Sequence, residues 1–148
     1  MKRIATALLL ALCTGSMNVV SVARGASAEM RASKSEVKQE IVAVIEAQLT
    51  AFRKGELEKA YGYAAADLRA QKSLRTFTTI VQGNYPEIWA STRAEFGIVR
   101  DDGTRATVTV QVYSKTADAP YDFTLTKERA GWRIYGVARH EPKKAGKV

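Results

Sequence analysis

The chain has almost none of the residues on which thiol and imidazole chemistry depend. It contains one cysteine, Cys13, and one histidine, His140, among 148 residues. Cys13 lies in an N-terminal stretch that we expect to be removed, which excludes disulfides, thiolate catalysis and cysteine-ligated metals from the mature protein. His140 follows the last predicted strand and cannot form a metal site alone. The sequence therefore predicts neither a metal nor a cofactor.

The first 28 residues have the pattern of a secretory signal peptide. Two basic residues precede the uncharged apolar run Ile4 to Leu12, and Ala26-Ser27-Ala28 supplies the small residues that a signal peptidase requires. The run is too short to span a bilayer as a mature helix. We therefore expect residues 1–28 to be a signal peptide, the protein to be periplasmic or secreted, and the mature chain to lack a transmembrane segment. Lipid anchoring through Cys13 is the minor alternative, because Leu12 before it is not small.

Positive charge is in excess, but much of it lies at the two ends of the chain. The formal net charge is +8. Residues 1–28 hold three basic residues and no acid, and residues 141–148 hold three lysines against one glutamate. The single domain expected at residues 29–140 therefore carries only about +3, too little to require a nucleic acid partner, and we predict none. Residues 141–148 are predicted to be a basic flexible tail.

The segment from Ser33 to Lys54 has the strongest helical period in the chain. At about 100° per residue, one broad face collects Val37, Ile41, Val44, Ile45, Leu49 and Phe52. Ser33 and Glu36 have the spacing of a capping box at the helix start. Gly55 is suited to the left-handed conformation that ends a helix.

Two shorter helices are predicted after Gly55. The first has a helical face made by Leu57, Ala60, Tyr61, Ala64 and Leu68. Ser73 is expected to cap the second, which Gly83 ends and whose shared face is Leu74, Phe77 and Val81. Asn84-Tyr85-Pro86 then predicts extended or turning backbone, because proline restricts the residue before it.

From Ile88 onward the pattern changes from helical to alternating. A first predicted strand, with Phe96 and Ile98, leads into a hairpin at Asp101-Asp102-Gly103. Turns at Ala117 to Pro120 and at Ala130-Gly131 separate three further strands, whose apolar positions are Val108, Val110 and Val112, then Tyr121, Phe123 and Leu125, then Trp132 and Ile134. The sequence thus predicts an α+β fold in which three N-terminal helices pack on the one apolar face of a curved antiparallel sheet of about four strands.

Several short segments resemble a known family, in the same order and at similar spacing. They are Ala51-Phe52, the stretch Ala60 to Ala64, Ile80-Val81, Asn84-Tyr85-Pro86 and the stretch Gly131 to Val137. Together they resemble a bacterial family known only as a domain of unknown function (number 4864), within the nuclear-transport-factor-2-like superfamily, over about residues 37–139. The resemblance implies a cone whose sheet wraps around the long first helix and often encloses a pocket. It implies no established activity and no catalytic residues. Ala65-Ala66-Asp67 departs from the Ser-Pro pair usual in the family.

We expect an exported, non-catalytic domain that binds a small apolar or amphipathic ligand or a protein partner. The alternative is an isomerase- or dehydratase-like enzyme that uses the cone pocket, which requires a carboxylate or imidazole there beside a proton donor. No such base is expected inside, since Asp122 alternates outward and Asp67 lies at a helix end. Tyr61 and Tyr85 can donate a hydrogen bond, but no base is evident beside them.

Five residues are predicted to line a ligand site: Gln48, Tyr61, Tyr85, Trp89 and Tyr121. Gln48 interrupts the apolar arc of the long helix, so its amide must bond to Tyr61 or Tyr121, to a trapped water or to a ligand. A pocket filled by the protein's own side chains is the alternative to an open site. The resemblance also makes a homodimer an expectation, through the flat outer sheet face formed by Thr107, Thr109, Gln111, Thr124, Thr126 and Tyr135.

Overall fold

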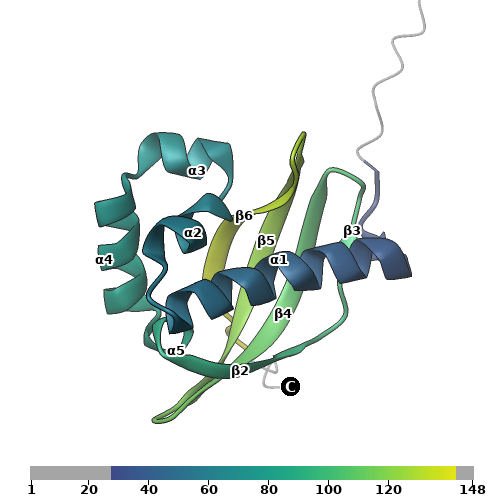
Figure 1. Cartoon of the computed structure of the whole chain (residues 1–148). Coiled ribbons are helices and arrows are strands. Elements are labelled where there is room, and N and C mark those ends of the chain that lie inside the picture. Colours follow the sequence, from purple (N-terminus) through teal and green to yellow (C-terminus); the bar gives the residue numbers. More distant parts are fainter. Residues whose placement is uncertain (1–27, 143–148) are drawn as a thin grey trace, which may run out of the picture.

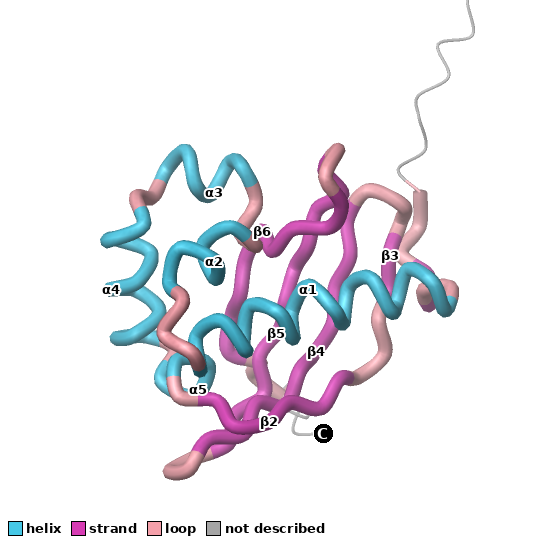
Figure 2. Tube along the Cα trace, viewed as in Figure 1, coloured by secondary structure: helices cyan, strands magenta, loops and turns pink. Residues whose placement is uncertain are grey.

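Helix α1 (Ser35–Arg53) lies across one face of a curved, open antiparallel sheet (Figure 1). This is a computed structural model, which describes residues 28–142. The shorter helices gather on the β6 side of the sheet (Figure 2), and they are α2 (Leu57–Gly62), α3 (Ala66–Gln71), α4 (Leu74–Asn84) and α5 (Pro86–Trp89). The predicted α+β class, with helices on one sheet face, is confirmed. The signal-peptide prediction, Cys13 included, and most of the predicted tail lie outside the described residues.

The apolar face of α1 forms the centre of the core. Ile41, Ile45 and Leu49 are fully buried on it, and burial of such side chains contributes roughly 1.5–3 kcal/mol each. Across from them lie the inward side chains of the strands, all buried: Val108, Val110 and Val112, then Tyr121, Phe123 and Leu125, then Trp132 and Ile134. The predicted inward faces of both the helix and the strands are therefore confirmed.

The predicted C-terminal end of α1 is confirmed, whereas the capping box predicted at its start is not. At its C-terminal end, Gly55 adopts φ +70°, and the N–H groups of Gly55 and Glu56 donate to the carbonyls of Phe52 and Ala51. This is a Schellman cap, as the glycine predicted. The capping box at the start was wrong. The Ser33 hydroxyl donates to Asp101, and Lys34 occupies the N-cap without a side-chain cap.

The single helix predicted from Leu57 to Leu68 is two helices, α2 and α3. Between them Ala64 forms a parallel bridge to Ile134 of the last strand. The Ile134 N–H donates to the Tyr63 carbonyl at 2.9 Å, and the Ala65 N–H donates to the Ile134 carbonyl at 2.8 Å. These bonds to the edge strand use backbone groups that a continuous helix would pair internally, so the helix breaks there.

Helix α4 confirms the predicted third helix, and α5 adds one that was not predicted. The Ser73 hydroxyl accepts from the Thr76 N–H, which makes Ser73 the N-cap. Tyr85 follows α4 with φ −130° and ψ 59°, outside both the helical and the extended regions, and Pro86 then opens α5. Proline suits the first helical turn because its missing N–H has no partner there anyway. The described part of the chain therefore has five helices, where three were predicted.

Over residues 28–142 the sheet has six strands rather than about four. Their order is β1-β3-β4-β5-β6, with β2 also paired to β4. The strands are β1 (Arg31–Ala32), β2 (Ser91–Phe96), β3 (Arg100–Asp101), β4 (Arg105–Ser114), β5 (Asp118–Glu128) and β6 (Gly131–Arg139). The predicted first strand is broken into β2 and β3 around Gly97, whose backbone approaches the Thr109 carbonyl so closely that a Cβ would lie 3.0 Å from it. Strand β1 adds a short edge by pairing with β3.

Two predicted turns differ in their outcome. The Asp101-Asp102-Gly103 hairpin is confirmed, with Gly103 at φ +91° and β3 paired to β4. The second turn ends at Ala117, so Pro120 lies inside β5 opposite Gln111. Its carbonyl accepts from the His140 N–H just past the end of β6. Proline is tolerated there because its missing donor faces the end of the neighbouring strand.

Candidate functional site

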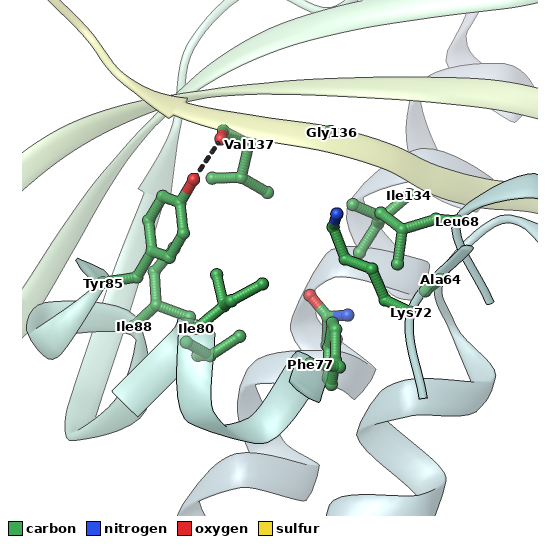
Figure 3. A pocket seen from close by; sticks show the side chains of 12 residues that line it. Ala64, Leu68, Lys72, Phe77, Ile80, Tyr85, Ile88, Ile134, Gly136 and Val137 are labelled. Atoms are coloured by element: carbon green, nitrogen blue, oxygen red, sulfur yellow. Dashed lines mark hydrogen bonds between the residues drawn. The ribbon is translucent and has the colours of Figure 1, made fainter. Parts of the chain in front are cut away.

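A cavity of about 240 Å³ lies between the group of short helices and β6 (Figure 3). The wall of the cavity is mostly apolar. It is formed by α3, α4, α5, β6 and the connection between α2 and α3. The apolar lining side chains are Ala64, Leu68, Phe77, Ile80, Val81, Ile88, Ile134 and Val137. Within residues 28–142, the lining side chains that carry polar atoms are three: Gln48, Lys72 and Tyr85. An apolar concavity with a few placed polar groups is the usual form of a small-molecule site.

Gln48 reaches the cavity from α1 and is 4% exposed, so the predicted inward amide is confirmed. Its Nε2 donates to the Ala60 carbonyl at 3.1 Å, a backbone partner that was not among those expected. Within residues 28–142 no hydrogen bond involves its Oε1. The amide is therefore anchored by its nitrogen, and its oxygen is left as an acceptor.

Lys72 connects α3 to α4 and contributes the only charged group of the cavity wall within residues 28–142. Figure 3 shows its side chain with the ammonium end directed toward β6. The backbone at this point is fixed by Tyr61, whose hydroxyl lies 2.5 Å from the Lys72 carbonyl and 2.9 Å from the Arg69 carbonyl. Tyr61 itself is absent from the lining, so it acts on the cavity through Lys72.

Tyr85 closes the other side of the cavity. Its hydroxyl donates to the Val137 carbonyl at 2.9 Å, which ties the α4–α5 junction to β6 (Figure 3). Its ring lies 5.8 Å from the ring of Tyr121, centroid to centroid. Gln48 and Tyr85 are thus the two predicted site residues that line the cavity. Trp89 instead packs against Phe52, with ring centroids 5.9 Å apart.

Tyr121 lies outside the cavity wall, in a buried polar cluster that the sequence did not predict. Its hydroxyl donates to Glu87, which is 6% exposed, and Arg139 Nη2 lies 2.9 and 3.0 Å from the two Glu87 oxygens. Burial and the Glu87 carboxylate raise the pKa of Tyr121 to about 12. Burial alone would raise the pKa of Glu87, but hydrogen bonds from Tyr121, its own backbone and Arg139 lower it below its usual value. Glu87 is therefore ionised, and its carboxylate is already hydrogen-bonded to Tyr121 and Arg139.

Glu87 and Lys72 are the residues that the sequence analysis missed. Lys72 lies between the two predicted short helices, and no local pattern marks it as facing a cavity. The sequence around Glu87 could have predicted the start of a helix, because proline and an acid are both favoured in the first helical turn and Pro86 and Glu87 are adjacent. A helix of four residues is too short to show an apolar period.

The outer sheet face is polar and half-exposed, as predicted, and it holds a second carboxylate cluster. Asp122 accepts from the Thr109 hydroxyl at 2.6 Å, and His140 Nδ1 lies 2.8 Å from its other oxygen. Burial raises the pKa of Asp122, but the contacts to Thr109 and His140 lower it overall. The predicted outward orientation of Asp122 is confirmed. The pair sits on the face opposite the cavity.

Comparisons with known proteins place the chain in one family. No curated protein matches it, and no solved structure does. No helix within residues 28–142 has the length and apolar character needed to cross a membrane. The family described as Domain of unknown function (DUF4864) matches residues 34–146. Of the elements that the structure describes, this range includes the five helices and all strands except β1, and it includes the lining residues of the cavity. The chain therefore belongs to the DUF4864 family.

Proposed function

We propose that this protein is a non-catalytic binding domain that holds a small apolar or amphipathic molecule in the cavity beside β6. The observation that carries the proposal is the apolar wall around about 240 Å³ of space. Typical ligand pockets measure roughly 300–1,000 Å³, so the expected ligand is small. A core filled by its own side chains would leave few voids larger than a water molecule.

The chemistry of the wall favours binding over catalysis. Within the described residues, the titratable side chains that line the cavity are Lys72 and Tyr85, and neither a carboxylate nor an imidazole is among them. Glu87 is a buried carboxylate next to the lining residue Ile88, but it does not line the cavity. It is hydrogen-bonded to Tyr121 and Arg139. An isomerase- or dehydratase-like reaction needs a base in contact with the substrate, so this alternative has weaker support.

Three further expectations from the sequence analysis belong to the proposal. Residues 1–28 are proposed to be a signal peptide, which makes the protein periplasmic or secreted. The curved sheet with α1 across it supports a place in the nuclear-transport-factor-2-like superfamily, with its cone-shaped fold. The polar outer face, with Tyr135 46% exposed, is the proposed surface for a homodimer.

Binding of the neutral fluorescent probe N-phenyl-1-naphthylamine tests the proposed site. We expect its emission to rise in the presence of the protein, and we expect Val137→Phe, which fills the cavity, to weaken binding by about tenfold or more. Leu68→Trp fills the cavity from a partly exposed position and serves if Val137→Phe folds poorly. Ile98→Ala is the control, because Ile98 is 68% exposed and lies outside the cavity wall. Equal binding by the filled variants and the unaltered protein would contradict the proposal, as would no binding at all.

A further inference from the structure

We propose that the ligand of the cavity is a small monocarboxylate, whose apolar body fills the cavity and whose carboxylate pairs with Lys72. This inference rests on the proposed function and specifies its ligand class. Three observations lead to it: the charge of the wall, the positioning of Lys72 and the pairing of the other charged groups nearby.

Lys72 is a cation in an otherwise uncharged wall. The other lining side chains within residues 28–142 are apolar or neutral, and Lys72 itself is half-buried. A charged group partly removed from water is costly unless an opposite charge faces it. A ligand with a negative end supplies that charge, whereas a cationic ligand would add repulsion.

The protein does not supply this counter-charge itself. Within residues 28–142, none of the ion pairs or side-chain hydrogen bonds involves the Lys72 ammonium. Other charged groups near the core or the sheet have partners: Glu87 pairs with Arg139, and Asp122 pairs with His140. Lys127, on the surface, pairs with Glu40. Lys72 therefore differs from these groups in having its free ammonium beside an apolar cavity.

The position of Lys72 is built into the fold. The Tyr61 hydroxyl fixes the Lys72 carbonyl, and the Tyr61 ring packs 5.3 Å from the ring of Phe77, which lines the cavity. The Lys72 side chain extends toward β6, so its methylene groups add to the apolar wall while its ammonium remains available (Figure 3). A linear acid would place its chain against Phe77 and Ile80, with its carboxylate at this ammonium.

Three probes of equal chain length separate charge from apolar fit: octanoate, 1-octanol and octylammonium. Isothermal titration of the purified chain at low ionic strength should rank octanoate first, about tenfold tighter than 1-octanol, since a charge-assisted hydrogen bond contributes about that much. Octylammonium should bind weakest. The preference for octanoate should shrink as salt is added.

Substitutions of Lys72 then test the residue itself. Lys72→Met keeps much of the volume and should equalise octanoate and 1-octanol, while Lys72→Arg should retain the preference for octanoate. Lys72→Glu should reverse it, so that octylammonium binds tightest. Lys115→Met is the matched control, because Lys115 is exposed in the β4–β5 turn. Lys72 is half-buried at a helix–helix connection, so these variants are expected to fold, which thermal melts verify.

The outcomes separate the two proposals. If 1-octanol binds as tightly as octanoate and Lys72→Met changes neither, the monocarboxylate inference is wrong while the binding function stands. If none of the probes binds and N-phenyl-1-naphthylamine does not bind either, both are wrong. A preference for octanoate that survives Lys72→Met would also overturn the inference, because the charge would then be recognised elsewhere.

Discussion

The hydroxyl of Tyr121 donates a hydrogen bond to the carboxylate of Glu87, and this contact joins β5 to helix α5 inside the protein. Tyr121 is fully buried, and Glu87 is nearly so. Arg139, at the end of β6, completes the cluster from the half-exposed side. The cluster fixes α5, and with it Tyr85 and Ile88, the neighbours of Glu87 that line the cavity. A polar group outside the cavity thus holds part of its wall in place.

Removing the Glu87 carboxylate should destabilise the protein. Glu87→Ala leaves the buried Tyr121 hydroxyl without its acceptor, which costs about 1–3 kcal/mol of unfolding free energy. Tyr121→Phe should cost less, about 1 kcal/mol, because Glu87 keeps Arg139. Urea denaturation measures both. Glu58→Ala, at an exposed position on α2, is the control and should leave the midpoint unchanged. Equal stability of Glu87→Ala and the unaltered protein would show that the cluster is dispensable.

Acid should weaken the fold through the same residue. The pKa of Glu87 is lowered in the folded state, so its contribution is fully present above its usual pKa, about 4.3, and is lost as the pH falls through the folded value. The pKa of Asp122 is lowered as well, which adds a similar loss at lower pH. We expect stability to fall below about pH 4.5. Glu87→Gln should be less stable at pH 7 and should lose less on acidification. An unchanged acid profile for this variant would assign the effect to other groups.

Local periodicity was enough to predict the core and the fold class. Ile41, Ile45 and Leu49 on α1 and Val108, Val110 and Val112 on β4 are buried because side-chain direction follows the backbone repeat. What sequence reasoning missed depends on contacts distant in the chain. Ser33 could cap its own helix or bond to Asp101, 68 residues away, and the distant partner prevails. The helix break at Ala64 likewise requires Ile134.

The candidate site was predictable only in part, for the same reason. Gln48 stands out as an amide on an apolar face, and Tyr85 stands beside a proline, so both could be chosen from local sequence. Lys72 faces the cavity only because Tyr61 fixes its backbone and β6 lies opposite. Trp89 and Tyr121 were predicted to line the site, but their rings pack against Phe52 and Tyr85 instead. An aromatic residue type does not by itself say whether the side chain meets a cavity or another side chain.

Export can be tested by the mass of the mature protein. If residues 1–28 are a signal peptide, the exported chain begins at Glu29, and intact mass spectrometry should give the mass of residues 29–148. Ala26→Leu together with Ala28→Leu should block cleavage, because the peptidase requires small residues there. A product that begins at Cys13 and carries acyl groups would establish the lipoprotein alternative instead. A chain that retains residues 1–28 in the unaltered protein would contradict the prediction.

The final prediction concerns Gln48, whose nitrogen is anchored at the Ala60 carbonyl while its oxygen has no partner within residues 28–142. Gln48→Leu should cost only about 1 kcal/mol, because the Ala60 carbonyl also accepts from the Tyr63 N–H at 3.3 Å. It should leave apolar probes bound.

Gln48→Glu should be far more damaging, because it replaces the donor that faces the Ala60 carbonyl by a buried carboxylate. Because Lys72 lines the same cavity and could pair with this carboxylate, the test uses the Lys72→Met background. There burial should raise the pKa of such a group by about two units or more, so adding Gln48→Glu should cost about 3 kcal/mol at pH 7. A folded pKa above the unfolded value makes this loss smaller as the pH falls, so between pH 7 and pH 5 the variant should gain stability while the unaltered protein changes little. Urea denaturation at both pH values measures the difference, with Glu58→Gln as the exposed control. If Gln48→Glu is as stable as Gln48→Leu at pH 7, the Gln48 amide cannot be held in the buried position that the structure shows.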